Sequence, residues 1–124
     1  MAIKLAAQNR DDHDLEVMEE IIRKSYEVMD DWEKYIDYGM RFNIAMARSS
    51  KNQILYIISY MVAVAGRDNY ITGTKKLSDV EIQKTCKRTY QEHLGLLEAI
   101  RLKDSELACV RNLKHIEGTR DTFY

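Results

Sequence analysis

The chain has 124 residues, 19 of them Lys or Arg and 20 Asp or Glu, which leaves a net charge of −1 at pH 7. This balance excludes the basic surface that holds the phosphate backbone of DNA, and no apolar run approaches the roughly 20 residues that a membrane span requires. The length suits one domain, residues 1–124, with a single hydrophobic core. The first residues lack the pattern of a secretion signal, so we expect a cytoplasmic location.

Helices are favoured throughout the chain. It contains no proline and only five glycines, a composition that permits long helices and disfavours a turn-rich β fold. We therefore predict an all-α fold, an antiparallel helical bundle of about six helices. Cys86 and Cys109 both lie in helical segments, so we expect two reduced, structural thiols rather than a disulfide.

The first half of the chain predicts three helices. Residues 2–9 have the composition of a helix end. Asp11, with Asp14 three residues later, suits the N-cap of a second, amphipathic helix that continues to about Met29. A third helix is expected from about Asp31 to Ser50, with one stripe that a glycine and an asparagine interrupt: Trp32, Ile36, Gly39, Asn43 and Met46.

A fourth helix is expected to begin after Asn52, which suits its N-cap. The sequence that starts at Gly66 is expected to end this helix, and residues 66–77, which are polar and include two glycines, are predicted to form a loop. The helix carries a broad apolar face that we predict to lie in the core: Ile54, Ile57, Ile58, Met61, Val62 and Ala65.

Two further helices complete the chain. Ser78 and Glu81 have the spacing of a capping box at the start of the fifth helix. Asp104 is the expected N-cap of the sixth, which is predicted to end near Gly118. On the sixth helix, polar residues at 112 and 115 lie beside an apolar line and should flank the core. That line consists of Cys109, Leu113 and Ile116.

Two histidines are expected to meet in the hairpin formed by these last helices. The turn falls near Lys103 and Asp104, with His93 ten residues before the first and His115 eleven residues after the second. At about 1.5 Å per residue, both imidazoles stand roughly 15 to 17 Å up the hairpin. We therefore predict that the two rings share one level of the bundle.

Four polar residues, Asn43, His93, Asn112 and His115, lie on or beside these apolar stripes. A buried polar group without a partner costs about 1 to 3 kcal/mol, so each must be satisfied. Two explanations remain open. The groups bond one another or buried water, or they line a pocket for a small molecule, as in other helical bundles. Arg41, on the same helix as Asn43, is a candidate to offer its guanidinium to a carboxylate ligand.

Catalytic motifs are absent: the chain has no nucleophile elbow, no phosphate-binding glycine loop and no HisGluXXHis or GluXXHis motif. We therefore predict no enzyme activity and no catalytic residue. A metal ion would need three or more good ligands, whereas only His93 and His115 lie at this level. Cys86 lies two helical turns from His93, too far to share an ion, and His13 is expected at the surface.

Several segments resemble the FCD domain, the C-terminal effector-binding domain of FadR-type GntR transcription regulators. Residues 2–15 are similar to the end of its first helix and the start of its second. Residues 42–52 are similar to a later stretch with the same ten-residue separation of Phe42 and Asn52. Residues 92–100, with Asp104, Ala108 and His115, resemble its closing hairpin.

The resemblance implies a dimeric helical bundle that follows an N-terminal winged helix and binds a small organic acid or another metabolite. In the family, one aspartate and three histidines often hold a metal ion. His93 and His115 match two of these histidines, whereas Gly39 and Asn43 stand at the aspartate and first histidine positions. Asp37 would point about 200° away from the aspartate position. The resemblance therefore implies a pocket that is metal-free or holds zinc or nickel weakly.

Three functions follow as hypotheses. The first is an effector-sensing domain whose pocket, formed by Asn43, His93, His115, Asn112 and Arg41, holds a small anionic metabolite. The second is a dimerisation bundle with a decayed, metal-free pocket. The third is a small metal-dependent enzyme, which lacks a general base or nucleophile beside the histidines. In the first two, DNA binding would belong to a winged-helix domain outside this chain.

Overall fold

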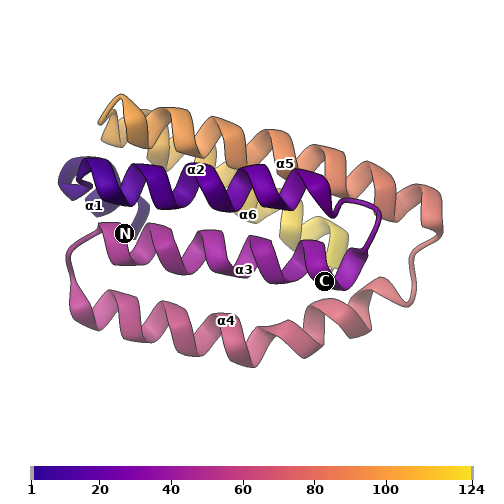
Figure 1. Cartoon of the computed structure of the whole chain (residues 1–124). Coiled ribbons are helices and arrows are strands. Elements are labelled where there is room, and N and C mark those ends of the chain that lie inside the picture. Colours follow the sequence, from indigo (N-terminus) through magenta and orange to yellow (C-terminus); the bar gives the residue numbers. More distant parts are fainter. Residues whose placement is uncertain (1, 124) are drawn as a thin grey trace.

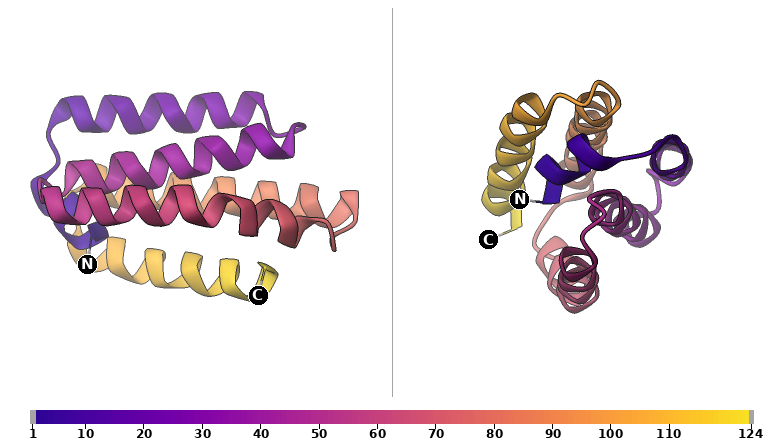
Figure 2. Two further views of the ribbon diagram at one scale, coloured as in Figure 1. Left: turned by 90° about the horizontal axis from the view of Figure 1, so that it is seen from below. Right: turned by 90° about the vertical axis from the view of Figure 1, so that its left-hand side faces the viewer.

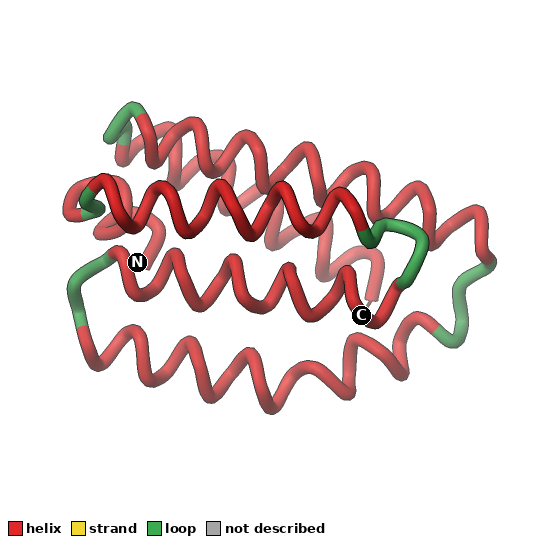
Figure 3. The backbone as a smooth tube through the Cα atoms, in the orientation of Figure 1, coloured by secondary structure: helices red, strands yellow, loops and turns green. Residues whose placement is uncertain are grey.

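The fold is all-α, as the sequence predicts. The computed structural model describes residues 2–123, which contain six helices and no strand (Figure 1). Short loops and turns join them (Figure 3). The helices are α1 (Ala2–Asn9), α2 (Asp12–Glu27), α3 (Trp32–Ser49), α4 (Gln53–Thr74), α5 (Asp79–Arg101) and α6 (Ser105–Phe123).

The five long helices run alternately up and down, and the short α1 crosses one end of the bundle (Figure 2). Helix α3 packs between α2 and α4, while α5 packs against α6 and α2. Helix α1 contacts α3, α5 and α6, so it closes the space between the two sides of the bundle. None of the helices over residues 2–123 is long and apolar enough to cross a membrane.

The predicted helix starts are confirmed by their caps. Asp11 and Asp14 form a complete capping box at the start of α2, in which each side chain accepts a hydrogen bond from the backbone N–H of the other. Such caps satisfy N–H groups that have no partner within the helix. The other side chains that accept a backbone N–H at a helix start are Asp31, Asn52, Ser78 and Asp104.

The hydrophobic core lies towards the end of the bundle that α1 covers. Phe42, Met18, Leu96 and Ile100 are its largest fully buried apolar side chains, and they come from α2, α3 and α5. Ala6 of α1 is fully buried in the same cluster. The core therefore fills this end of the bundle.

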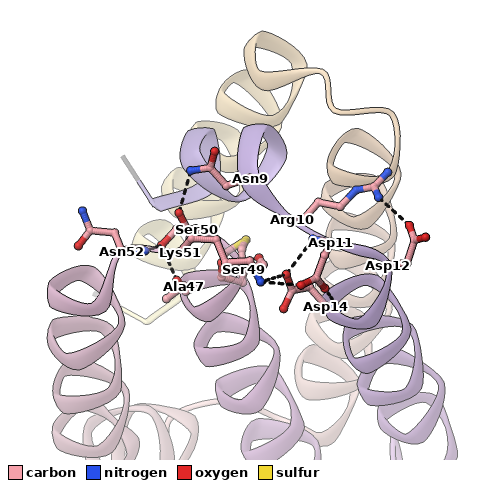
Figure 4. Close-up of polar contacts among 11 residues, drawn as sticks. Asn9, Arg10, Asp11, Asp12, Asp14, Ala47, Ser49, Ser50, Lys51 and Asn52 are labelled. Atoms are coloured by element: carbon pink, nitrogen blue, oxygen red, sulfur yellow. Dashed lines mark hydrogen bonds and ion pairs between the residues drawn. The ribbon is translucent and has the colours of Figure 1, made fainter.

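A polar corner fixes α2 against the turn between α3 and α4 (Figure 4). Lys51 has φ 59°, a left-handed conformation, and its ammonium group donates to the carboxylates of Asp11 and Asp14. Asn9 donates from its side chain to the carbonyl oxygen of Ser50. The hydrogen bond from the Asp14 backbone and the contact with Lys51 lower the pKa of Asp11 to about 2.

Two predictions for the fourth helix are wrong. The helix does not end at Gly66 but continues to Thr74, so most of the predicted loop is helical. A mid-helix glycine costs only about 1 kcal/mol relative to alanine, which the rest of this helix outweighs. The predicted core face is also exposed: Ile54, Met61 and Val62 are among the most exposed apolar side chains of the chain.

The sixth helix also differs from its prediction. It runs through Gly118 to Phe123. Of the apolar line expected beside the core, Leu113 and Ile116 are exposed and only Cys109 packs against the core. The reason is that α6 lies at the outside of the bundle, where α5 and α1 cover only one of its sides.

Candidate functional site

A cavity of about 90 Å³ lies between α3, α5 and α6. Helix α3 supplies mainly apolar and aromatic side chains to its wall, whereas α5 and α6 supply most of the polar groups. The lining residues are Trp32, Tyr35, Ile36, Gly39, Met40 and Asn43 of α3, Tyr70 of α4, Thr85, Thr89 and His93 of α5, and His115, Thr119 and Phe123 of α6.

The two histidines meet in this cavity, as predicted from their distances to the turn. The ring centroids of His93 and His115 are 4.9 Å apart, with the planes at 66°. The ring of His93 also lies 4.9 Å from that of Phe42, a fully buried residue of the core. Its side chain is buried, and that of His115 is 12% exposed.

The turn between α5 and α6 sets this shared level. Lys103 has φ 55°, and the backbone N–H of Asp104 donates to the carbonyl oxygen of Ala99. This hydrogen-bonded reversal ends α5 at Arg101 and starts α6 at Ser105. Each histidine then stands a similar number of residues from the turn, so the two rings face each other.

His93 is neutral at physiological pH. Burial, and next the charge that His115 can carry, lower the pKa of His93 from 6.5 to about 3. A neutral imidazole has one N–H donor and one nitrogen acceptor. The His93 ring can therefore donate a hydrogen bond to an anion without first taking up a proton.

A chain of charged groups leads from the surface to His115. The Nδ1 atom of His115 lies 3.4 Å from Oε2 of Glu92, and Nε of Arg88 lies 3.2 Å from Oε1 of the same carboxylate. Both contacts are within ion-pair distance but lack hydrogen-bond geometry. Nδ1 of His115 and Oε1 of Glu92 are thus buried polar atoms without a hydrogen bond among residues 2–123.

Tyr35 and Thr89 form a second polar group in the wall. The Tyr35 hydroxyl lies 2.6 Å from Oγ1 of Thr89 and donates to the carbonyl oxygen of Cys86 at 3.0 Å. Burial raises the pKa of Tyr35, although the hydrogen bond with Thr89 opposes the rise. Burial also raises the pKa of the free Cys86 thiol to about 11, so this thiol stays protonated.

The structure brings three of the five predicted ligand-binding residues together. His93, His115 and Asn43 line the cavity. Arg41 instead lies at the surface, with its guanidinium carbon 4.9 Å from the centre of the Tyr38 ring. Asn112 is half-buried and does not belong to the cavity wall.

Sequence reasoning missed most of the wall. Thr85 and Thr89 lie two turns and one turn before His93 on the same side of α5, and Thr119 lies one turn after His115. The separation of these threonines from the histidines by whole helical turns is the sequence signal that indicates them. Glu92 could not be found in the same way, because its carboxylate reaches His115 from the next position around the helix.

The side chains present do not fit the metal quartet that the family often uses. A Cβ atom built at Gly39 would lie 3.7 Å from Cε1 of His93, so an acidic side chain there would point at this ring, but glycine supplies no oxygen. Asn43 offers a neutral amide where the family has an imidazole. Over the described range, no group of three or more His, Cys, Asp or Glu residues could hold an ion.

An all-α bundle with a small, partly polar cavity between its long helices defines a helical ligand-binding architecture. Residues 1–118 match the family model of the FCD domain, and the chain therefore belongs to this family. This domain is the FadR C-terminal domain of GntR-family regulators, where it has an effector-binding, regulatory role. The comparison with curated proteins gave no match.

Proposed function

We propose that this domain senses a small anionic metabolite in the cavity between α3, α5 and α6, as part of a cytoplasmic transcription regulator. The observation that carries the proposal is the pair of imidazoles, 4.9 Å apart, in a cavity that also exposes hydroxyl groups. The buried Nδ1 atom of His115 supports it further, because a buried polar atom without a hydrogen bond is costly.

A carboxylate suits these groups better than a neutral ligand. The rings of His93 and His115 can each offer an N–H donor to a carboxylate oxygen. Thr119 adds a hydroxyl group to the wall from α6.

The size of the cavity indicates a short ligand. Pockets for drug-sized molecules have volumes of about 300 to 1,000 Å³, well above the 90 Å³ found here. A short-chain acid fits this volume, whereas the acyl chain of a long acyl-thioester does not. The ligand would touch three helices at once, so it can favour one arrangement of these helices over another. DNA binding would belong to a winged-helix domain, as the family implies.

Thermal unfolding with a panel of short mono- and dicarboxylic acids tests this function. An acid present at 100 times its Kd should stabilise the protein by about 2.7 kcal/mol, visible as a raised Tm. His93→Gln and His115→Gln should remove the shift. His13→Gln is the matched control, because His13 is exposed on α2 and should leave the shift unchanged.

A dimerisation bundle with a decayed pocket is the second candidate, and Gly39 and Asn43 at the family's ligand positions favour it. No shift with any acid, together with a stable dimer, would support that candidate over the sensor. Elemental analysis of the purified protein checks the metal alternative. Stoichiometric zinc or nickel that is lost in His93→Gln would support a metal site, which would need a third ligand besides the two histidines.

A further inference from the structure

The cavity extends along the bundle, and its wall is built in levels one helical turn apart. On α5 and α6 the successive levels are His93 with His115, Thr89 with Thr119, and Thr85 with Phe123. On α3, Gly39 lies beside His93, and Trp32 lies seven residues before Gly39. At about 1.5 Å per residue, the third level is roughly 12 Å from the first. The cavity therefore has two ends whose chemistry can differ.

Aromatic rings surround the end of the cavity that lies away from the histidines. The ring of Phe123 lies 6.1 Å from that of Trp32 and 5.4 Å from that of Tyr70. Trp32 also stacks on Tyr35, with 6.1 Å between the ring centroids. A Cβ atom built at Gly73 would lie 3.6 Å from Cδ1 of Phe123, so the end of α6 packs directly against α4. Helices α3, α4 and α6 thus all contribute rings to this aromatic end.

The hydroxyl groups between the two ends are largely engaged within the protein. Thr85 donates to the carbonyl oxygen of Glu81. Thr89 donates within α5, to the carbonyl oxygens of Thr85 and Cys86. The Tyr35 hydroxyl donates to the carbonyl oxygen of Cys86. The middle of the cavity therefore offers few donors to a ligand, in contrast to the level of the two imidazoles.

The wall also lacks a cation. None of the residues between 2 and 123 that line the cavity is Lys, Arg, Asp or Glu. The neutral polar groups towards the aromatic end include the hydroxyl of Thr119 and Nε1 of Trp32, a buried atom without a hydrogen bond among the described residues. One neutral N–H suits an uncharged oxygen but does not replace the water around a carboxylate. An ionised group at this end would therefore be buried without a counter-charge.

Building on the function proposed above, on which this inference rests, we propose that the ligand is a short monocarboxylate with an uncharged, mainly apolar tail. Its carboxylate lies beside His93 and His115, and its tail points towards the rings of Trp32 and Phe123. The tail is short, with about three to five carbons in the whole acid, because a cavity of roughly 150 Å³ holds the six carbons of benzene. Burial of its methylene groups favours binding, whereas a second carboxylate would lose water without gaining a partner.

Isothermal titration calorimetry with butyrate and succinate tests this ligand class. The two acids have the same number of carbons, and both are ionised at about pH 7.5. The Kd of succinate should be at least about a hundredfold higher than that of butyrate, because burial of an unpaired charge is costly. Equal Kd values, or tighter binding of succinate, would overturn the inference and leave the proposed function standing. No binding of any short acid would remove both.

Thr119 allows a test by gain of function, because it lies one turn beyond His115 in the direction of the tail. In Thr119→Lys, an ammonium group becomes available to a second carboxylate. This variant should bind succinate at least about tenfold more tightly than the unaltered protein does, as expected for a charge-assisted hydrogen bond, and should bind butyrate more weakly. Ile116→Lys is the matched control, since it adds the same charge to α6 at a position that is 54% exposed. It should leave both Kd values unchanged.

Thr119→Val separates the hydroxyl group of this residue from its place in the wall. Valine has a similar shape, so butyrate should still bind with a Kd within about twofold of the original value if its tail is apolar. Far-UV circular dichroism checks that each variant is folded. Loss of butyrate binding in a folded Thr119→Val, no gain of succinate binding in a folded Thr119→Lys, or an equal gain in Ile116→Lys would contradict this placement of the tail.

Discussion

His93 is a buried residue with a titratable side chain, and this combination links folding to pH. Its pKa is about 3 in the folded protein and about 6.5 in the unfolded chain. Between these values the unfolded chain binds more protons, so its population rises as the pH falls. The contribution of His93 to the free energy of unfolding is therefore fully present above pH 6.5 and is lost as the pH falls towards 3. The loss amounts to at most about 1.4 kcal/mol per pH unit.

Urea unfolding at several pH values measures this dependence. Between pH 6.5 and 5, where most carboxyl groups stay ionised, His93→Gln should remove most of the slope of the free energy of unfolding against pH. His13→Gln, at an exposed position, should retain the slope. An unchanged slope in His93→Gln would show that the ring is charged or solvated in the folded protein.

Lys51 shows how one residue connects helices that are far apart in sequence. It ends the turn between α3 and α4 in a left-handed conformation and contacts the capping box of α2. Asp14, one of its two partners, is buried, so removal of the ammonium group leaves a buried carboxylate with fewer partners. Lys51→Ala should therefore destabilise the fold by about 1 kcal/mol or more.

Lys51→Gly separates the ion pairs from the backbone conformation. Both variants lose the ion pairs, but glycine adopts a positive φ without the strain that a Cβ atom causes. The glycine variant should be more stable than the alanine variant by about 1 kcal/mol in urea unfolding. Equal stabilities would mean that the turn does not keep its left-handed residue in solution.

Local capping patterns predicted the helix starts because a cap depends only on nearby residues. Asp11, Asn52 and Asp104 each accept the backbone N–H that their spacing indicates. The paired histidines were predictable for a similar reason, since a tight hairpin fixes the register of its two helices. Both features follow from short-range geometry.

The environment of α4 could not be predicted, because it depends on what lies beside the helix. The periodicity of Ile54, Ile58 and Met61 shows that one side is apolar, but the same pattern fits a core and an interface between subunits. Gly66 likewise predicts a helix end, but its cost of about 1 kcal/mol is small for a helix of 22 residues. The wall of the cavity depends likewise on the packing of three helices, so only its histidines and Asn43 were identified.

The cavity is a property of the whole bundle, since it exists where α3 passes α5 and α6 with a glycine at the contact. A Cβ atom at Gly39 would meet His93 at 3.7 Å, an ordinary van der Waals contact, so Gly39→Ala should fit without strain. It should stabilise the protein by about 0.5 to 1 kcal/mol, because alanine favours helix over glycine. The added methyl group would also take up part of a cavity of only 90 Å³.

Gly66→Ala provides the matched control for this last change. A Cβ atom at Gly66 of α4 would lie 3.9 Å from Cε2 of Tyr70, so alanine should be accepted there with a similar gain in stability. Only Gly39→Ala should weaken the thermal shift given by an acid that stabilises the unaltered protein. If both variants kept the full shift, the acid would bind outside the space beside His93. If Gly39→Ala alone lost it, glycine at this position would preserve room for the ligand at the expense of stability.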